Sequence, residues 1–148
     1  MAEIVEKKRV RLNAAISAVP LGELKDRISD MERPRDFYTA IKGLGGIRLI
    51  AELKKASPSR GVIRPDFDPA VISRIYREKA DAVSVLTEEE YFLGRLDYIK
   101  IAKEHSARPV LRKDFIFNIY QIYESRAAGA DAILLIERLL DTSQASEY

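Results

Sequence analysis

Two lysines at the ends of short apolar segments are the residues best suited to chemistry in this chain. Lys54 follows the apolar run 47–53, and Lys113 lies within Leu-Arg-Lys-Asp-Phe at 111–115. In a partly desolvated site a lysine can bind an anion or act as an acid, because neighbouring groups tune its ammonium. Either lysine alone could equally be a solvated strand end. Two of them, each close to a carboxylate, favour a site.

Glu52 is the carboxylate that the strand pattern places beside Lys54. Successive strand side chains point to opposite faces, so residues 52 and 54 share one face. Burial of a carboxylate and an ammonium costs hydration energy, and proteins rarely keep such a pair without a function for it. We therefore expect Glu52 and Lys54 to have a functional role. Glu52 could orient Lys54 and pass protons, or serve only as its neutralising partner. Asp114 lies on the opposite face from Lys113, where a cap or loop bond is expected rather than catalysis.

Groups that could bind a ligand follow the same segments. Ser57 and Ser59, with Arg60 next, offer hydroxyls and a guanidinium that could hold a phosphate or carboxylate. The same composition is also that of an ordinary turn, which is the slightly favoured explanation. Phe92 and Phe115 could form an aromatic wall for a planar ligand, although aromatic residues near strand ends belong to the core more often.

Two other polar features are expected at the surface. The acidic run Glu88–Glu90 is most simply a solvated loop segment. His105 falls at the end of an amphipathic helical pattern, which is typical of a surface position. Neither feature is predicted to take part in the site.

Composition excludes several classes of protein. The 148 residues contain no cysteine and one histidine, so disulfides are excluded and a metal site is not expected. The 25 basic and 23 acidic residues are interspersed, which argues against a nucleic-acid interface. No apolar stretch approaches the roughly 20 residues that span a bilayer. The charged, helical N-terminal pattern is unlike a signal peptide, so we expect a cytoplasmic protein.

Periodicity divides the chain into a helical segment followed by alternating strands and helices. Residues 1–46 carry helical patterns interrupted at Pro20 and Pro34 and closed by glycines. Strands are expected at 48–53, 81–86, 109–112 and 131–136, and helices at 69–79, 96–104 and 118–128, with a further helix starting at 141. The segment between the first strand and the helix at 69 is expected to be a long polar loop.

Alternating strands and helices indicate a parallel α/β sheet, whose ligands bind beyond the carboxyl ends of the strands. An open doubly wound sheet and a barrel both remain compatible with four strands. The chain lacks a Gly-x-Gly-x-x-Gly fingerprint after any strand, and functional groups at several strand ends favour a barrel. Because a (β/α)8 barrel needs about 250 residues, we expect an N-terminal half-barrel of about four βα units at 47–148. The helical extension is expected at 1–46.

Four ordered motifs resemble the indole-3-glycerol phosphate synthase family. They are Ile50–Ser59, Leu86–Gly94, Leu111–Phe115 and Ala128–Ile136. The resemblance implies a (β/α)8 barrel with an N-terminal helical extension. It also implies a cofactor-free ring closure in tryptophan biosynthesis, in which an anilino-deoxyribulose phosphate loses carbon dioxide and water.

The resemblance also implies roles for individual residues. Lys113 would be the general acid that protonates the substrate ketone oxygen. Lys54 would bind the anthranilate carboxylate, with Glu52 in the same hydrogen-bonded group. The substrate-binding residues implied are Ser57 at the phosphate and Phe92, Phe115 and Leu134 in the apolar wall of the anthranilate pocket.

The chain departs from the family pattern because it stops inside the expected fourth barrel helix. The glutamates, asparagine, serine and glycine-rich phosphate loops of the family's second half are absent, so we expect no useful activity from these 148 residues alone. The alternative is a non-catalytic half-barrel that associates with itself or with a complementary half through its free strand edges. Another phosphate-binding barrel is disfavoured by the Lys54 and Lys113 motifs.

Overall fold

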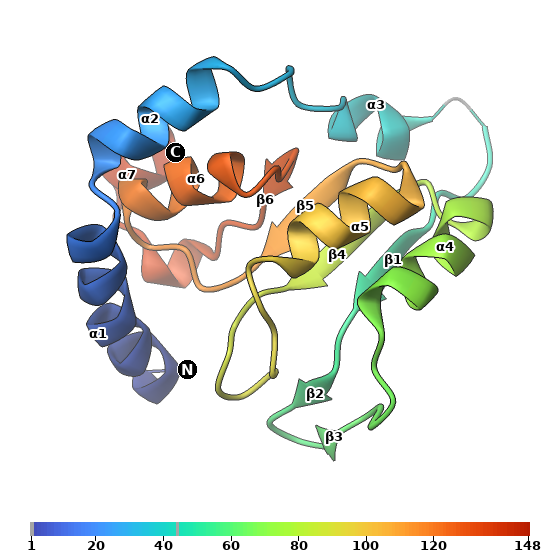
Figure 1. Ribbon diagram of the computed structural model, residues 1–148, viewed down its shortest axis with the longest axis horizontal. Coiled ribbons are helices and arrows are strands. Elements are labelled where there is room, and N and C mark those ends of the chain that lie inside the picture. Colours follow the sequence, from blue (N-terminus) through green and yellow to red (C-terminus); the bar gives the residue numbers. More distant parts are fainter. Residues whose placement is uncertain (1, 44) are drawn as a thin grey trace.

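A four-stranded parallel sheet forms the centre of the molecule in a computed structural model, which describes residues 2–43 and 45–148 (Figure 1). The strand order is β1-β4-β5-β6, and each neighbouring pair runs parallel. The strands of this sheet are β1 (Ile50–Leu53), β4 (Ala82–Leu86), β5 (Val110–Lys113) and β6 (Ala132–Ile133). Two shorter strands, β2 (Ala56–Ser57) and β3 (Gly61–Val62), pair antiparallel outside it.

Helices precede the sheet and connect its strands. They are α1 (Ala2–Ala18), α2 (Leu21–Ser29), α3 (Phe37–Lys42), α4 (Pro69–Lys79), α5 (Tyr98–Ser106), α6 (Ile119–Ala127) and α7 (Thr142–Glu147), with a 3-10 turn, η1, at Glu137–Leu139. Three of the later helices start at side-chain caps that the sequence indicates. Asp68 accepts from the amides of Ala70 and Val71, and Asn118 and Asp141 each form a capping box.

The main core lies between the sheet and helices α4 and α5. Leu53, Val83, Val85 and Val110 are almost fully buried, and they pack with Ile72 of α4 and with Ile99 and Ala102 of α5. Because strand side chains alternate, the intervening residues of β1, β4 and β5 face the other side of the sheet. The helices therefore cover one face, and the second face carries the predicted site.

Two aspartates tie the starts of consecutive strands together. Asp81 accepts a hydrogen bond of 2.8 Å from the amide of Leu49, just before β1. Asp131 does the same for the amide of Val110 at the start of β5, at 2.9 Å. Each carboxylate precedes the strand that follows, so it closes a strand–helix unit and stabilises the register.

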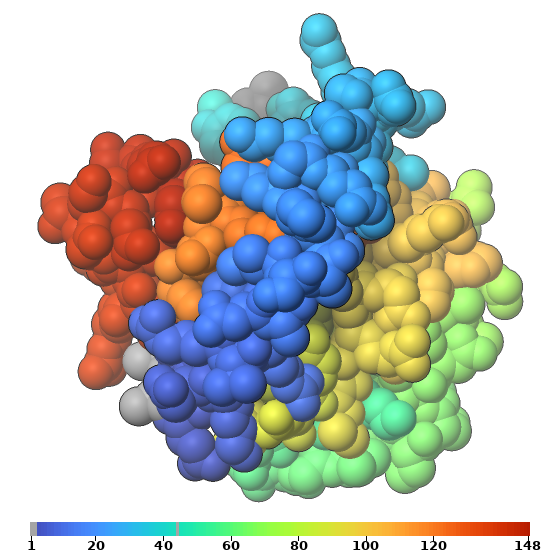
Figure 2. Space-filling model, turned by 60° about the vertical axis from the view of Figure 1, so that its left-hand side comes forward, coloured from blue at the N-terminus to red at the C-terminus, as the bar shows by residue number. Residues whose placement is uncertain are grey.

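The first two helices pack against α6 rather than against the sheet core. Leu12 of α1, Leu24 of α2 and Tyr120 of α6 share a second apolar cluster with Phe117. The Tyr120 hydroxyl also donates to the carbonyl of Val19, at 2.9 Å. Figure 2 shows α1 and α2 as one blue band across this side of the molecule, with α6 in orange beside them. The division at residue 46 remains a prediction.

The sequence predictions were right about element types and wrong in two details. The strand–helix order and the parallel sheet are confirmed, and strand ends shift by at most three residues. The expected loop after β1 contains the β2–β3 hairpin. The expectation that 47–53 forms a buried strand is wrong at its start, because Ile47 is 100% exposed and Leu49 is 49% exposed. In the described part of the chain β1 is the edge of the sheet, so nothing covers that side.

Candidate functional site

Glu52 and Lys113 lie on the face of the sheet opposite α4 and α5. The register pairs Glu52 with Ser84 and Ser84 with Leu111. Lys113 pairs with Leu86, two residues further along both strands, and so points to the same face as Leu111. Neighbours in register of a parallel sheet share a face. Glu52 of β1 and Lys113 of β5 therefore approach each other across β4.

The three residues predicted to be catalytic form one ion-paired group. Glu52 lies 2.7 Å from the ammonium of Lys54 and also accepts a hydrogen bond from the ammonium of Lys113, 61 residues away in sequence. The shared face of Glu52 and Lys54, expected from alternation, is confirmed. All three side chains stay partly exposed, at 25% for Glu52, 35% for Lys54 and 41% for Lys113.

The ionisation of Glu52 follows from this arrangement. Burial opposes its charge, but the ammonium groups of Lys113 and Lys54 outweigh burial and hold the pKa of Glu52 below its usual value. The carboxylate is therefore charged near neutral pH. Two ammonium groups around one carboxylate leave a net positive charge at the open face, which suits an anionic ligand.

The predicted binding residues follow four different strands at the same end of the sheet. Phe92 and Phe115 form an aromatic pair with ring centroids 6.5 Å apart and planes tilted by 45°. Ser57 lies in β2, and the adjacent Ala56 donates its amide to the carbonyl of Phe92 at 3.1 Å. Leu134 follows β6 and donates its amide to the carbonyl of Arg112 at 3.1 Å. The structure thus gathers the predicted residues at the carboxyl end of the sheet.

Glu88 is a site residue that the sequence prediction missed. It is 4% exposed, and its carboxylate accepts from the amides of Glu90, Tyr91 and Phe92 at 3.1, 2.8 and 3.1 Å. The expectation of a solvated run is therefore wrong for Glu88, because three consecutive amides compensate its burial. This carboxylate folds the loop that presents Phe92. A single buried position inside an acidic run leaves no signal in the sequence.

Glu89 and Glu90 are exposed, but they contact the N-terminal helix rather than solvent alone. Glu89 lies 3.2 Å from the guanidinium of Arg11, and Glu90 lies 3.0 Å from the ammonium of Lys7. The basic face of α1 thus meets the acidic loop that follows β4. The sequence displays both charge clusters, and their pairing follows from the fold.

Buried charges flank Lys113 on both sides along β5. Arg112 is 3% exposed and donates to Asp114, Glu124 and Ser125 at 2.9, 2.8 and 3.0 Å. Asp114, also 3% exposed, accepts from the hydroxyl of Thr87 at 2.6 Å. The sequence prediction placed Asp114 on the face opposite Lys113, and the same alternation could have identified Arg112, because a charged residue that faces a helix requires partners.

Asp114 makes the loop bond expected from the sequence and several more. Its carboxylate accepts from the amide of Phe115 and from the ammonium of Lys8, both at 2.8 Å. Burial disfavours its charge, but Arg112, Lys8 and Thr87 together hold the pKa of Asp114 below its usual value. Asp114 is therefore an ionised structural group behind the site.

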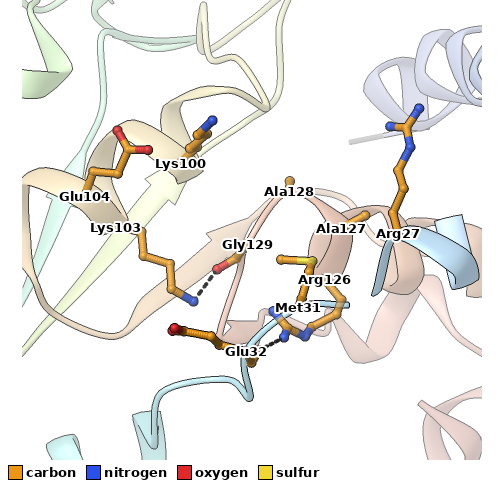
Figure 3. Close-up of a pocket in the computed structure, with 10 residues that line it drawn as sticks. All are labelled: Arg27, Met31, Glu32, Lys100, Lys103, Glu104, Arg126, Ala127, Ala128 and Gly129. Atoms are coloured by element: carbon orange, nitrogen blue, oxygen red, sulfur yellow. Dashed lines mark hydrogen bonds between the residues drawn. The ribbon is translucent and has the colours of Figure 1, made fainter. Parts of the chain in front are cut away.

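The largest hollow of those described lies elsewhere. It measures about 470 Å³ and is open on the helical side, between α2, α5 and α6 (Figure 3). Two of the cations that line it have partners, since Lys103 lies 2.6 Å from Asp131 and Arg126 donates to the carbonyl of Glu32. None of the predicted site residues lines it. In the described residues, no His, Cys, Asp and Glu cluster suits a metal ion, and no helix has the length and apolarity to cross a membrane.

The parallel sheet, with its charged and aromatic groups at the carboxyl end, defines an α/β protein with part of a (β/α)8 barrel. The family model of indole-3-glycerol phosphate synthase matches residues 1–148, and the chain belongs to this family.

Similar sequences that carry the same name support the assignment. The chain is 47% identical over 139 residues to the indole-3-glycerol phosphate synthase of Alkaliphilus metalliredigens, covering 93% of this chain and 53% of the relative. Identity is 45% over 149 residues for the Acetivibrio thermocellus protein, with 99% and 57% covered. It is 49% over 148 residues for a Dehalococcoides mccartyi protein, with 97% and 54% covered. The chain therefore spans a little over half the length of these relatives.

Proposed function

We propose that this chain supplies one half of the active site of an indole-3-glycerol phosphate synthase. The reaction converts 1-(2-carboxyphenylamino)-1-deoxyribulose 5-phosphate to indole-3-glycerol phosphate with loss of carbon dioxide and water. The observation that carries the proposal is the group in which Glu52 joins Lys54 and Lys113 from different strands. Such a group fits a doubly anionic substrate that must gain a proton as it closes a ring.

Lys113 is the proposed general acid. As the aromatic carbon bonds to the ketone carbon, the ketone oxygen gains negative charge, and the Lys113 ammonium gives it a proton. Its hydrogen bond to Glu52 occupies one N–H, and its 41% exposure on the open face leaves room for a substrate oxygen. General acids of this kind typically contribute 10²–10⁴-fold to rate.

Lys54 and Glu52 are proposed to bind and balance charge beside the reacting atoms. The Lys54 ammonium would hold the substrate carboxylate until it leaves as carbon dioxide, and would then serve as an acid when the new hydroxyl leaves as water. Glu52 keeps both ammonium groups oriented toward the open face. Burial raises the pKa of Glu52, but the two lysines lower it further, so the pKa stays below its usual value and Glu52 stays ionised for this task.

The remaining residues are proposed to hold the two ends of the substrate. The tilted pair Phe92 and Phe115, with Leu134 after the next strand, would pack against the anthranilate ring. Ser57 would donate its hydroxyl to the phosphate. The bond between Ala56 and Phe92 keeps the phosphate side and the ring side of the site in contact.

We propose that the 148 residues alone do not turn over substrate usefully. The sheet of the described residues supplies four strands, and the chain covers 53–57% of the length of the relatives named above. Loss of a proton-transfer partner typically costs two to four orders of magnitude. Loss of groups that orient the phosphate costs more, because orientation lowers the barrier substantially.

A chimeric chain tests this function. We would join this sequence to the remaining C-terminal part of the Alkaliphilus metalliredigens relative and follow the fluorescence of indole-3-glycerol phosphate. We expect turnover by the chimera, none by the 148 residues, and a loss of about 10²–10⁴-fold in Lys113→Ala. Lys79→Ala, at an exposed lysine of α4, is the matched control. Unchanged turnover in Lys113→Ala would exclude it as the acid.

A second candidate function is a half-barrel that associates with a copy of itself or with a complementary half. It rests on the uncovered side of the sheet, where Ile47 is fully exposed, Leu49 and Ile50 are 49% and 44% exposed, and α4 exposes Val71 and Ile75 at 44% and 54%. Such apolar surface next to a free strand edge favours association. Light scattering at several concentrations tests it, and a monomer throughout would rule out self-association.

A further inference from the structure

The N-terminal helix α1 contacts the loop between β4 and α5 that carries Phe92 (Figures 1 and 2). Arg11 lies 2.8 Å from Glu90, and Lys7 lies 3.0 Å from the same carboxylate. Tyr91 donates its hydroxyl to Glu3 at 2.6 Å. These contacts are largely exposed, so each contributes little to stability. Together they set the position of α1 along the loop.

Lys8 differs from its basic neighbours because it is buried. Its side chain is 8% exposed, against 47% for Lys7, and its ammonium lies 2.8 Å from Asp114 and 3.7 Å from Glu89. A buried ammonium is tolerated only with close partners, so its position is defined by Asp114. Lys8 thus reaches from α1 to the residue that follows Lys113.

The backbone around Lys113 is fixed by its two neighbours. Arg112 is bonded to Thr87, Glu124 and Ser125, and Asp114 is bonded to Thr87 and to the amide of Phe115. Removal of Lys8 would take the charged partner from one carboxylate oxygen of Asp114 and let that carboxylate shift, although Arg112 and Thr87 still hold its other oxygen. Because Lys113 lies between these residues, its ammonium would then lose its fixed direction toward Glu52.

We infer that Lys8 is a positioning residue for Lys113, acting through the carboxylate of Asp114. The inference deepens the proposed function and rests on it, because it assigns the N-terminal helix a part in the placement of the general acid. Lys8 itself does not touch the substrate. Its effect reaches the reaction through the direction in which Lys113 points.

The first experiment uses the 148-residue chain and needs no activity. We would follow the pH titration of the Glu52 carboxyl carbon by NMR in wild type, Lys8→Met, Lys8→Arg and the matched exposed control Lys7→Met. If Lys113 turns away, Glu52 loses an ammonium partner and its pKa rises in Lys8→Met. Lys8→Arg, which retains the charge, should restore the wild-type titration, and Lys7→Met should leave it unchanged.

If Lys8 had a purely structural role, its loss would lower the stability of the fold without changing the pKa of Glu52. An unchanged Glu52 titration in a folded Lys8→Met variant would therefore overturn the inference. If Lys8→Met does not fold, the Glu52 titration is measured in Lys8→Gln, which keeps an N–H donor for Asp114 but loses the charge. We then expect a Glu52 pKa between those of wild type and of a chain without the Lys8 contact. A folded Lys8→Gln variant with the wild-type titration would count against the inference.

The second experiment uses the chimeric chain described above. We expect kcat to fall by about tenfold or more in Lys8→Met, with KM within about threefold of wild type, because misplacement of an acid affects the chemical step. Lys7→Met should retain wild-type kcat. An inactive chimera would refute the proposed function and leave the Glu52 titration as the test of the link. An active chimera whose kcat is unchanged by Lys8→Met would refute the inference and leave the proposed function standing.

Discussion

The two faces of β5 hold charged side chains in opposite conditions. On the helical face, Arg112 and Asp114 are each 3% exposed and have several partners apiece. On the open face, Lys113 is 41% exposed and bonded to Glu52. Consecutive residues at the end of β5 and directly after it thus separate two uses of charge. The satisfied face holds the fold, and the face with spare hydrogen-bonding capacity is available to a substrate.

Removal of the buried guanidinium should give the largest loss of stability. In Arg112→Met, Asp114 and Glu124 keep their positions but lose their main partner, and we expect the free energy of unfolding to fall by about 3–5 kcal/mol. Urea denaturation followed by circular dichroism measures it. Arg95→Met removes an exposed pair with Asp97 and should cause a much smaller loss of stability. Equal losses of unfolding free energy in Arg112→Met and Arg95→Met would contradict the contrast between buried and exposed charges.

Acid should weaken the buried face through Asp114. Its folded pKa lies below the unfolded value of about 3.9, so its contribution is present above that pH and is lost as pH falls through the folded pKa. At pH 7 we expect Asp114→Asn to cost roughly 2–3 kcal/mol. Below pH 4 the difference from wild type should shrink. A difference that stays constant from pH 7 to pH 2.5 would contradict the assignment.

Gln121 tests the segment 115–118, which connects β5 to α6. It is 1% exposed, accepts from the amides of Phe117 and Asn118 at 3.0 and 3.1 Å, and donates to the carbonyl of Phe115 at 2.9 Å. We expect Gln121→Ala to cost about 1–3 kcal/mol in urea denaturation.

The matched control for Gln121 is Gln144→Ala. Gln144 has the same place in the capping box of α7 at the outer end of the chain. Loss of that cap should cost about 0.5–1 kcal/mol. A larger loss at Gln144 than at Gln121 would contradict the expected contrast.

Neutralisation of the open face should give the smallest change in stability. In Lys113→Met we expect the free energy of unfolding to change by less than about 0.5 kcal/mol, because partly exposed ion pairs contribute little. Thermal unfolding measures it. The chimera with the same substitution should nevertheless lose activity. A loss of stability as large as that of Arg112→Met would mean that both faces of β5 serve the fold.

Local rules account for the parts of the site that the sequence predicted. Alternation places Glu52 and Lys54 together, and the cap at Asn118 marks the start of α6. The expectation that parallel strands end at one edge of the sheet placed Lys113 in the same site as this pair, and motif resemblance supplied its role; the contact itself spans 61 residues. Local pattern alone carries no information on such a distance.

What escaped prediction depends on tertiary environment. Glu88 differs from Glu89 and Glu90 only in where its side chain points, and three amides of a folded loop make its burial favourable. The apolar start of the first segment, with Ile47 fully exposed, looks like a buried strand, but burial requires a neighbour on that side. Both cases turn on contacts that no spacing of residues encodes.

The bond between Glu3 and Tyr91 has a practical consequence for handling the protein. Because Glu3 makes an ordered contact with the site loop, the first turn of α1 is not a neutral place for an affinity tag or a fluorophore. A bulky group there would press on Tyr91 and, through the loop folded by Glu88, on the ring of Phe92. Labels on exposed α4, at Glu78 or Lys79, would report on the molecule without disturbing this end of the sheet.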